Sequence, residues 1–334
     1  MKHWQETQKL FLEIDNLLQQ QRKAALATVV AIQGSAYRRP GAKLLIRDDG
    51  SLLGNVSGGC LEADLAEIGK MVMSTGETRT VRYETNGPED ELWGLGLGCN
   101  GTIELVVRPC QDRTLGDFSR QILLHLAEDQ AFSTTTVFAN PDHPEEEHWL
   151  DAEVVETRSF AVDGRSAFTE GFTPPPRLFI FGAGDDALPL VALAAQTGFR
   201  VVVVDHRPAL VTAARFPLAH NLVLARSEDG SKVPLGAGDY AVLKTHSLAQ
   251  DRGWFAHCAR ARVSYLGLMG PQARRLEVMK DGPEVPETTL FGPVGLDLGA
   301  DGAEQIAVAI VAEVLAVYHS RSPGHLRDRK KPIH

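Results

Sequence analysis

The sequence is poor in cysteine and lacks the short motifs of several common enzyme classes. Its four cysteines, Cys60, Cys99, Cys110 and Cys258, include no C-x-x-C pair. This excludes a disulfide framework and a zinc site of the usual spacing, and it fits a reducing cytosol. The sequence also contains no H-E-x-x-H, G-x-S-x-G or Walker A motif. The usual metalloprotease, α/β-hydrolase and P-loop NTPase functions are therefore excluded.

The sequence also lacks a basic excess and any long apolar run. It has 34 Lys and Arg against 43 Asp and Glu, a formal net charge of −9, whereas nucleic-acid binders carry a basic face. The apolar run at residues 24–32 is far shorter than the ~20 residues of a membrane helix. The N-terminal residues show no signal-peptide core. We therefore expect a cytoplasmic protein that binds neither nucleic acid nor membrane.

The length of 334 residues favours two domains, because single hydrophobic cores stop growing at roughly 250–300 residues. Three consecutive prolines at 174–176 are the clearest stop signal in the chain, since proline cannot continue a helix or a central strand. We place the boundary there, between a first domain at 1–110 and a second domain at 174–334. Residues 111–173 either continue the first domain or form a connecting segment.

The first domain is predicted to be mixed α/β. One-sided helical periodicity predicts helices, and short β-branched runs predict strands. The helices are expected at 3–20 and 60–73, and the strands at 25–32, 43–47, 51–54, 78–83 and 102–108. The connecting segment is predicted to hold a helix at 111–130, a strand at 134–138 and a polar surface loop at 140–148.

Strands and helices alternate in the second domain. Strands are predicted at 177–181, 200–204, 240–244 and 263–267, and the first helix at 185–197. Such alternation is typical of parallel β-α-β units. The sequence therefore predicts an α/β protein whose second domain is a Rossmann-like, doubly wound parallel sheet.

A glycine-rich turn joins the first strand and helix of the second domain. Gly182 permits a tight turn, and Gly184 lets backbone N–H groups approach a pyrophosphate. Asp205, at the end of the next strand, could accept a hydrogen bond from a ribose hydroxyl. Asp185 and Asp186 oppose this function, because carboxylates in the first helical turn repel an incoming phosphate. The alternative is a Rossmann scaffold kept for packing or docking.

Two cysteines lie in glycine-rich loops. Cys60 follows Gly58 and Gly59 at a predicted helix start, a position that lowers the pKa of a thiol. Cys99 follows Gly98 in a second glycine-dense loop. A single cysteine is ordinarily a buried small hydrophobe. Two of them in such loops favour a ligand, metal or sulfur site, and the other two cysteines are expected to be structural.

The loop between the first two strands contains Ser35, Arg38, Arg39 and Lys43. Three cations beside small residues favour an anionic, phosphate-bearing ligand, held by guanidinium forks and backbone N–H groups. A solvated surface loop is the plain alternative.

His246 follows the predicted strand at 240–244. Ligands of open α/β sheets lie at the carboxyl ends of the strands, so this is the histidine most suited to a functional role. A structural histidine is an equal alternative.

Together these segments resemble the XdhC/CoxI family of accessory proteins for molybdenum hydroxylases. The resemblance covers nearly the whole chain, in order, at 34–43, 57–62, 97–101, 181–184, 205–207, 215–217, 245–246, 265–270, 295–297 and 304–308. Asp185, Ser247 and residues 271–272 differ from the family pattern, all at the mouth of the predicted Rossmann crevice. They put nucleotide binding by the second domain in question.

The resemblance implies a chaperone that binds molybdenum cofactor, as molybdopterin or a dinucleotide form. Such a protein protects the cofactor during sulfuration and delivers it to a xanthine dehydrogenase-type hydroxylase. Cys60 and Cys99 would face the molybdenum or handle its sulfur, and Arg38, Arg39 and Lys43 would attract the pterin phosphate. A cysteine desulfurase is an expected partner, and a homodimer is expected because two-fold symmetry is the commonest.

Two other functions stay open at this stage. The chain could be an NAD(P)-dependent oxidoreductase, with Asp205 on the adenosine ribose and His246 as general acid or base. It could also be a thiol-based carrier of metal or sulfur that uses Cys60 and Cys99 without a pterin. A maturation role is favoured over a self-sufficient oxidoreductase, because the chain lacks the cysteine-rich iron–sulfur region of a complete hydroxylase.

Overall fold

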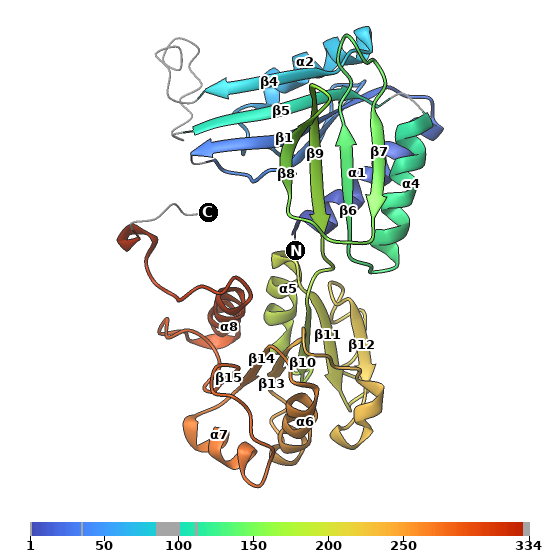
Figure 1. Cartoon of the computed structure of the whole chain (residues 1–334). Coiled ribbons are helices and arrows are strands. Elements are labelled where there is room, and N and C mark those ends of the chain that lie inside the picture. The colour runs from blue at the N-terminus through green and yellow to red at the C-terminus, as the bar shows by residue number, and fades with distance from the viewer. Residues whose placement is uncertain (1, 35, 85–100, 111–112, 330–334) are drawn as a thin grey trace. The chain divides into compact units, whose positions relative to one another are not determined.

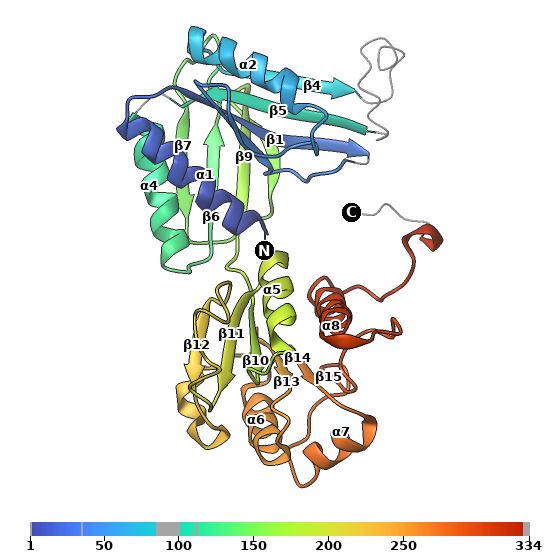
Figure 2. The ribbon, with the colours of Figure 1, turned by 180° about the vertical axis from the view of Figure 1, so that it is seen from behind.

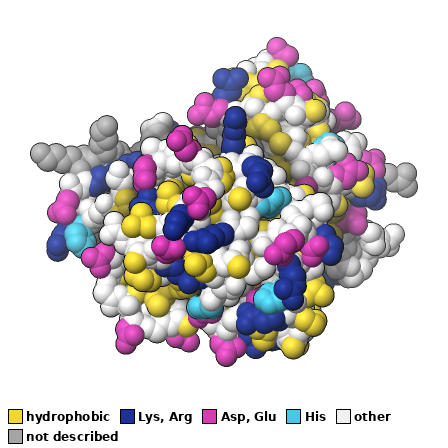
Figure 3. Space-filling view, turned by 90° about the horizontal axis from the view of Figure 1, so that it is seen from below, with side chains coloured by type: hydrophobic (Ala, Val, Ile, Leu, Met, Phe, Trp, Pro, Cys, Tyr) yellow, Lys and Arg dark blue, Asp and Glu magenta, His cyan; other side chains and the backbone are white. Residues whose placement is uncertain are grey.

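The computed structural model describes residues 2–34, 36–84, 101–110 and 113–329. The chain forms two compact units, Lys2–Pro174 and Pro175–Asp328 (Figure 1). Within the described residues, no helix combines the length and apolarity needed to cross a membrane. On the face shown in Figure 3, lysine and arginine side chains are interspersed with aspartate and glutamate side chains.

The first unit contains two antiparallel sheets. The five-stranded sheet has the order β3-β2-β1-β5-β4, and the four-stranded sheet has the order β7-β6-β9-β8. The strands are β1 (Ala24–Gly34), β2 (Lys43–Arg47), β3 (Leu52–Gly54), β4 (Arg79–Glu84), β5 (Gly101–Pro109), β6 (Phe132–Val137), β7 (Glu147–Asp151), β8 (Arg158–Val162) and β9 (Arg165–Phe172). The helices are α1 (Lys2–Gln19), α2 (Glu62–Thr75) and α4 (Arg113–Ala127).

Helix α2 covers one face of the five-stranded sheet, and α1, α4 and the four-stranded sheet pack on the other. Side chains alternate along β1, so that Ala25 and Ala27 face α2 while Leu26 faces α1 and α4. Helix α2 packs closely because Gly69 faces Ile46, where an added Cβ would lie 2.8 Å from the Ile46 Cδ1. Helices α1 and α4 lie side by side (Figure 2). Every residue of the first seven in β1 is therefore buried, as its continuous apolar run predicts.

The structure confirms the predicted α/β class and places most elements within a few residues of the predictions. Strands β7, β8 and β9 were not predicted, and neither were two strands of the second unit, Asn221–Leu224 and Leu290–Phe291. Strand β8 is mostly exposed, and β9 is buried despite containing Thr169 and Glu170. Neither shows the alternation of apolar and polar residues that signals a strand. Most of the predicted polar loop at 140–148 is exposed, but its last two residues begin β7.

The last residue of that loop is His148, whose side chain is only 3% exposed. Its ring stacks on Phe118 with the centroids 4.5 Å apart. Its Nδ1 lies 3.1 Å from the Thr136 hydroxyl, and its Nε2 lies 3.4 Å from Glu146 Oε2. Burial, together with the neighbouring Arg108 guanidinium, lowers the pKa of His148 to about 3.

We expect His148 to make the protein sensitive to mild acid. The unfolded chain takes up a proton near pH 6.5 and the folded chain only near pH 3. Stability is therefore lost as the pH falls through this window, by about 2 kcal/mol at pH 5. Urea unfolding of the wild type and of His148→Phe at pH 7, 6 and 5 measures this. An equal loss of stability in both proteins would contradict the assignment to His148.

The second unit is a six-stranded parallel sheet with helices on both faces. Its strands are β10 (Arg177–Phe181), β11 (Arg200–Asp205), β12 (Asn221–Leu224), β13 (Tyr240–Leu243), β14 (Tyr265–Leu268) and β15 (Leu290–Phe291). Its helices are α5 (Ala187–Thr197), α6 (Leu248–Ala261), α7 (Gln272–Met279) and α8 (Gly302–Tyr318), with short 3₁₀ turns η1 (Ser227–Lys232) and η2 (Leu326–Asp328).

The strand order β12-β11-β10-β13-β14-β15 is that of the Rossmann fold. Helices α5 and α8 pack on one face of the sheet, and α6 and α7 pack on the other. The predicted Rossmann-like, doubly wound sheet is confirmed. The order reverses between β10 and β13, which places the glycine-rich turn and His246 at the same carboxyl edge.

Candidate functional site

The glycine-rich turn after β10 has the backbone conformation that its sequence predicts. Gly182 has φ +117°, and an added Cβ would lie 2.4 Å from the Lys244 carbonyl oxygen. A larger residue would therefore push β10 away from the end of β13. Helix α5 begins at Ala187, so both acidic residues of this turn precede it.

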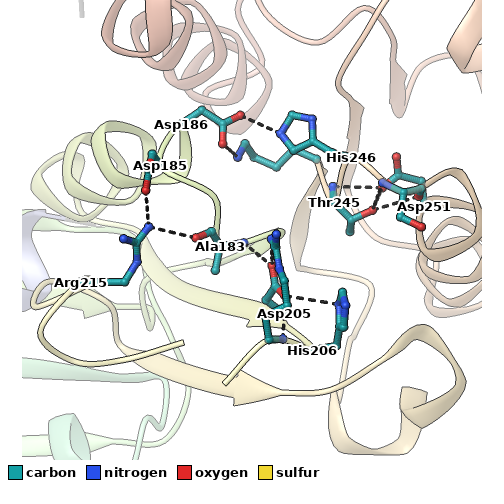
Figure 4. Close-up of polar contacts among 12 residues, drawn as sticks. Ala183, Asp185, Asp186, Asp205, His206, Arg215, Thr245, His246 and Asp251 are labelled. Carbon is teal, nitrogen blue, oxygen red and sulfur yellow. Dashed lines mark hydrogen bonds and ion pairs between the residues drawn. The ribbon is translucent and has the colours of Figure 1, made fainter. Parts of the chain in front are cut away.

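Asp186 lies close to the second glycine of this turn, and its carboxylate points toward His246 (Figure 4). Its Oδ1 would lie 2.8 Å from a Cβ added to Gly184, and it accepts a hydrogen bond from Lys244 Nζ at 2.6 Å. Its Oδ2 lies 3.2 Å from His246 Nε2. Burial alone would raise the pKa of Asp186, but the hydrogen bonds and charges of Lys244 and His246 together outweigh burial, and the net shift is downward. A negative charge therefore stands where the pyrophosphate of a dinucleotide would lie.

The Asp205 carboxylate also accepts hydrogen bonds from other residues of the chain. Its Oδ2 accepts from the Ala183 backbone N–H at 2.7 Å and from Arg207 Nη2 at 2.7 Å, and its Oδ1 accepts from Arg207 Nε at 3.0 Å. Despite burial, these bonds lower the pKa of Asp205 to about 2. The carboxylate holds the glycine turn against β11. Together with Asp186, it leaves this crevice a poor fit for NAD(P) bound in the usual Rossmann manner.

His246 lies at the carboxyl edge of the sheet, with its side chain 65% exposed and φ +59°. The unusual backbone is held by the preceding residue, because the Thr245 hydroxyl donates to Asp251 Oδ1 at 2.6 Å. Ser247, one of the departures from the family pattern, is the N-cap of α6. The structure thus brings His246, Asp186 and Asp205 together at one edge (Figure 4).

Cys60 is exposed and lies two residues before α2, on a loop organised by Glu62. Glu62 Oε1 accepts from the backbone N–H groups of Val56 and Ser57, both at 3.0 Å. Its Oε2 accepts from the Gly59 N–H at 2.9 Å and from the Ser57 hydroxyl. Burial would raise the pKa of Glu62, but these donors lower it overall. One ionised carboxylate therefore fixes the whole turn that presents the thiol.

Sequence reasoning missed Glu62 as an organising residue. The available signal was an acidic residue in the first turn of a predicted helix. Gly58 and Gly59 have φ +83° and +114°, conformations that glycine adopts readily. They allow three N–H groups of the loop to converge on a single side chain.

The predicted anion-binding loop does not present its three cations together. Lys43 is buried, and its ammonium donates to Glu170 and, at 3.0 Å, to the Gly41 carbonyl. Burial lowers the pKa of Lys43 in spite of its ion pair. Arg38 is paired with Glu6, while Arg39 is exposed. Of the three, the two arginines remain on the solvent side of the loop.

Three predicted site residues, Ser35, Gly98 and Cys99, lie outside the described residues. The remaining cysteines, Cys110 and Cys258, are buried in the hydrophobic cores of the two units. Burial raises the pKa of the Cys258 thiol well above its usual range, as expected for a structural cysteine. Among the described residues, no group of three or more His, Cys, Asp or Glu side chains is arranged to hold a metal ion.

Comparisons with known proteins agree with this architecture. The model of the XdhC and CoxI family matches residues 17–84, which include the Cys60 loop, and the model of the XdhC Rossmann domain matches residues 178–314. A Bacillus subtilis protein named as a probable xanthine dehydrogenase subunit is 34% identical over 90% of this chain and 95% of its own length. The molybdenum cofactor insertion chaperone PaoD of Escherichia coli is 27% identical over 95% and 93%.

A solved structure has the same fold. The crystal structure of a protein described as a xanthine dehydrogenase from Bacillus halodurans superposes with a TM-score of 0.79 at 28% identity. The match covers 93% of this chain and 96% of that one.

Proposed function

The chain belongs to the XdhC and CoxI family, and on that premise we propose that it binds molybdenum cofactor as cargo and supports its insertion into a hydroxylase of xanthine dehydrogenase type. The observation that carries this proposal is the exposed Cys60 on a turn held rigid by Glu62. A molybdenum centre that exchanges its terminal ligand supplies a soft, thiophilic partner. A fixed, accessible thiol suits such cargo, and the relative PaoD bears the name of an insertion chaperone.

The same unit also supplies positive charge for binding the cargo. Arg39 is exposed and Arg38 is half-buried beside Glu6, so the two guanidinium groups would meet the phosphate of the cargo. The proposal has three further parts. Cys99 acts with Cys60 on the cargo, a cysteine desulfurase supplies the sulfur for sulfuration, and the protein is a homodimer. The resemblance to the family supports the first two, and the frequency of two-fold symmetry supports the third.

The alternative of an NAD(P)-dependent oxidoreductase gains no support from the second unit. Its ribose acceptor, Asp205, already binds Ala183 and Arg207. Its pyrophosphate site contains the Asp186 carboxylate, paired with Lys244. We propose that this crevice is a structural or docking element of the accessory protein.

The test is a metal and pterin analysis of protein produced in cells that make molybdenum cofactor and are supplied with molybdate. We expect near-stoichiometric molybdenum and pterin in the wild type and at least a tenfold loss in Cys60→Ser. Cys258→Ala, which removes a buried thiol of the other unit, should retain the wild-type content. Wild-type protein without molybdenum would overturn the proposal, and a Cys60→Ser variant with full occupancy would overturn the role of the thiol.

A further inference from the structure

A pocket of about 160 Å³ lies beside the Cys60 loop. It is lined by Glu6 and Leu10 of α1, by Gly41 and Lys43 at the start of β2, by Leu53 of β3, and by Asn55, which precedes the Cys60 turn. A cavity of about 150 Å³ is large enough to bind a benzene ring. This pocket is therefore large enough for one flat ring and too small for a whole nucleotide.

The same pocket joins the two loops that the sequence singled out for different reasons. Asn55 lines it, and the Asn55 Oδ1 accepts a hydrogen bond from the Gly58 N–H at 2.9 Å, two residues before Cys60. Glu6 lines it from the other side and carries the ion pair with Arg38. A ligand in the pocket would thus contact Asn55, which binds the turn before Cys60, and Glu6, which binds Arg38.

Residues that carry hydrogen-bond donors and residues that carry acceptors both line this pocket. With Oδ1 bound to Gly58, the Asn55 amide nitrogen is left to donate. Lys43 has three N–H groups, and its described hydrogen bonds to Gly41 and Glu170 use two of them. Each oxygen of the Glu6 carboxylate accepts one hydrogen bond from Arg38 and can accept a further one. The rest of the lining includes the apolar side chains of Leu10 and Leu53.

From this arrangement we propose that the pocket receives the flat pyrimidine end of a pterin, the organic part of the cargo. That end presents a carbonyl oxygen and ring nitrogens as acceptors and an amino group as donor, which match Asn55, Lys43 and Glu6. Leu10 and Leu53 supply apolar contacts for the ring faces. The inference rests on the proposed function for the identity of the cargo, whereas the pocket and its donors are features of this chain alone.

In the experiment, pterin-6-carboxylate is titrated with the purified full-length protein, and the quenching of the pterin fluorescence is measured. We expect saturable binding by the wild type. Leu53→Trp, which fills the pocket, and Asn55→Asp, which keeps the acceptor for Gly58 but removes the donor, should each weaken binding at least tenfold. Leu53→Met is the size-matched control and should bind within twofold of the wild type. Thermal melting of each variant confirms that it is folded.

The molybdenum content of the same variants, isolated from cofactor-producing cells, separates the two ideas. Suppose that the wild type carries molybdenum and pterin, and that the folded Leu53→Trp and Asn55→Asp variants carry equal amounts. This result would overturn pterin binding in the pocket and would leave the proposed function standing. Wild-type protein that binds pterin-6-carboxylate in a Leu53-dependent way but never carries molybdenum would support the pocket and overturn the function. Wild-type protein that neither binds pterin-6-carboxylate nor carries molybdenum would overturn both the pocket proposal and the proposed function.

Discussion

Replacing Glu62 by alanine is expected to remove the cargo and to lower the free energy of unfolding by about 3 kcal/mol. The carboxylate accepts hydrogen bonds from the N–H groups of Val56, Ser57 and Gly59 and from the Ser57 hydroxyl. Alanine would leave these donors without an acceptor. Val56 is buried and Ser57 is half-buried, and a buried, unsatisfied donor costs about 1–3 kcal/mol. The turn would then no longer hold Cys60 in one place.

The measurement is urea unfolding together with the molybdenum content of protein from cofactor-producing cells. Glu67→Ala is the matched control, because Glu67 lies on the same helix and forms an exposed ion pair with Lys70. Such pairs contribute about 0–1 kcal/mol, so this variant should keep its cargo. Glu62→Ala protein with wild-type stability and full occupancy would show that the turn does not depend on the carboxylate.

The role of Glu62 also shows which parts of the site could be predicted from sequence. The glycines of the Cys60 loop and the Rossmann turn were recognised because their conformations depend on local sequence. The acidic residues of the Rossmann turn were predicted to oppose phosphate, and the structure places Asp186 close to Gly184. These inferences needed only neighbours in the chain. The convergence of three N–H groups on one carboxylate needed the folded turn.

Lys43 shows the other limit. Its sequence neighbours, Arg38 and Arg39, suggested a group of cations that faces a ligand. Its partner is Glu170, 127 positions away on β9, a strand that the sequence did not predict. Strand alternation turns Lys43 inward between the two sheets, and nothing in the sequence around it reports that partner. Non-local pairing is what a single sequence reveals least.

This buried pair gives the second large expected effect. Lys43→Met should lower the free energy of unfolding by about 3 kcal/mol, because it removes the ammonium that balances the Glu170 carboxylate in the interior. The double variant Lys43→Met with Glu170→Leu should recover most of that loss, since apolar residues of similar size replace a buried ion pair at little cost. Lys70→Met, which breaks an exposed pair, should cost less than about 1 kcal/mol.

The same variants separate a structural from a cargo-binding role for Lys43. If its ammonium only balances Glu170, the double variant recovers both stability and pterin binding. If the remaining N–H group also donates to the cargo, the double variant recovers stability but binds pterin-6-carboxylate more weakly than the wild type. We expect the second result, because Lys43 lines the pocket in addition to pairing with Glu170. A single variant that unfolds at the wild-type urea concentration would show that the pair adds nothing to stability.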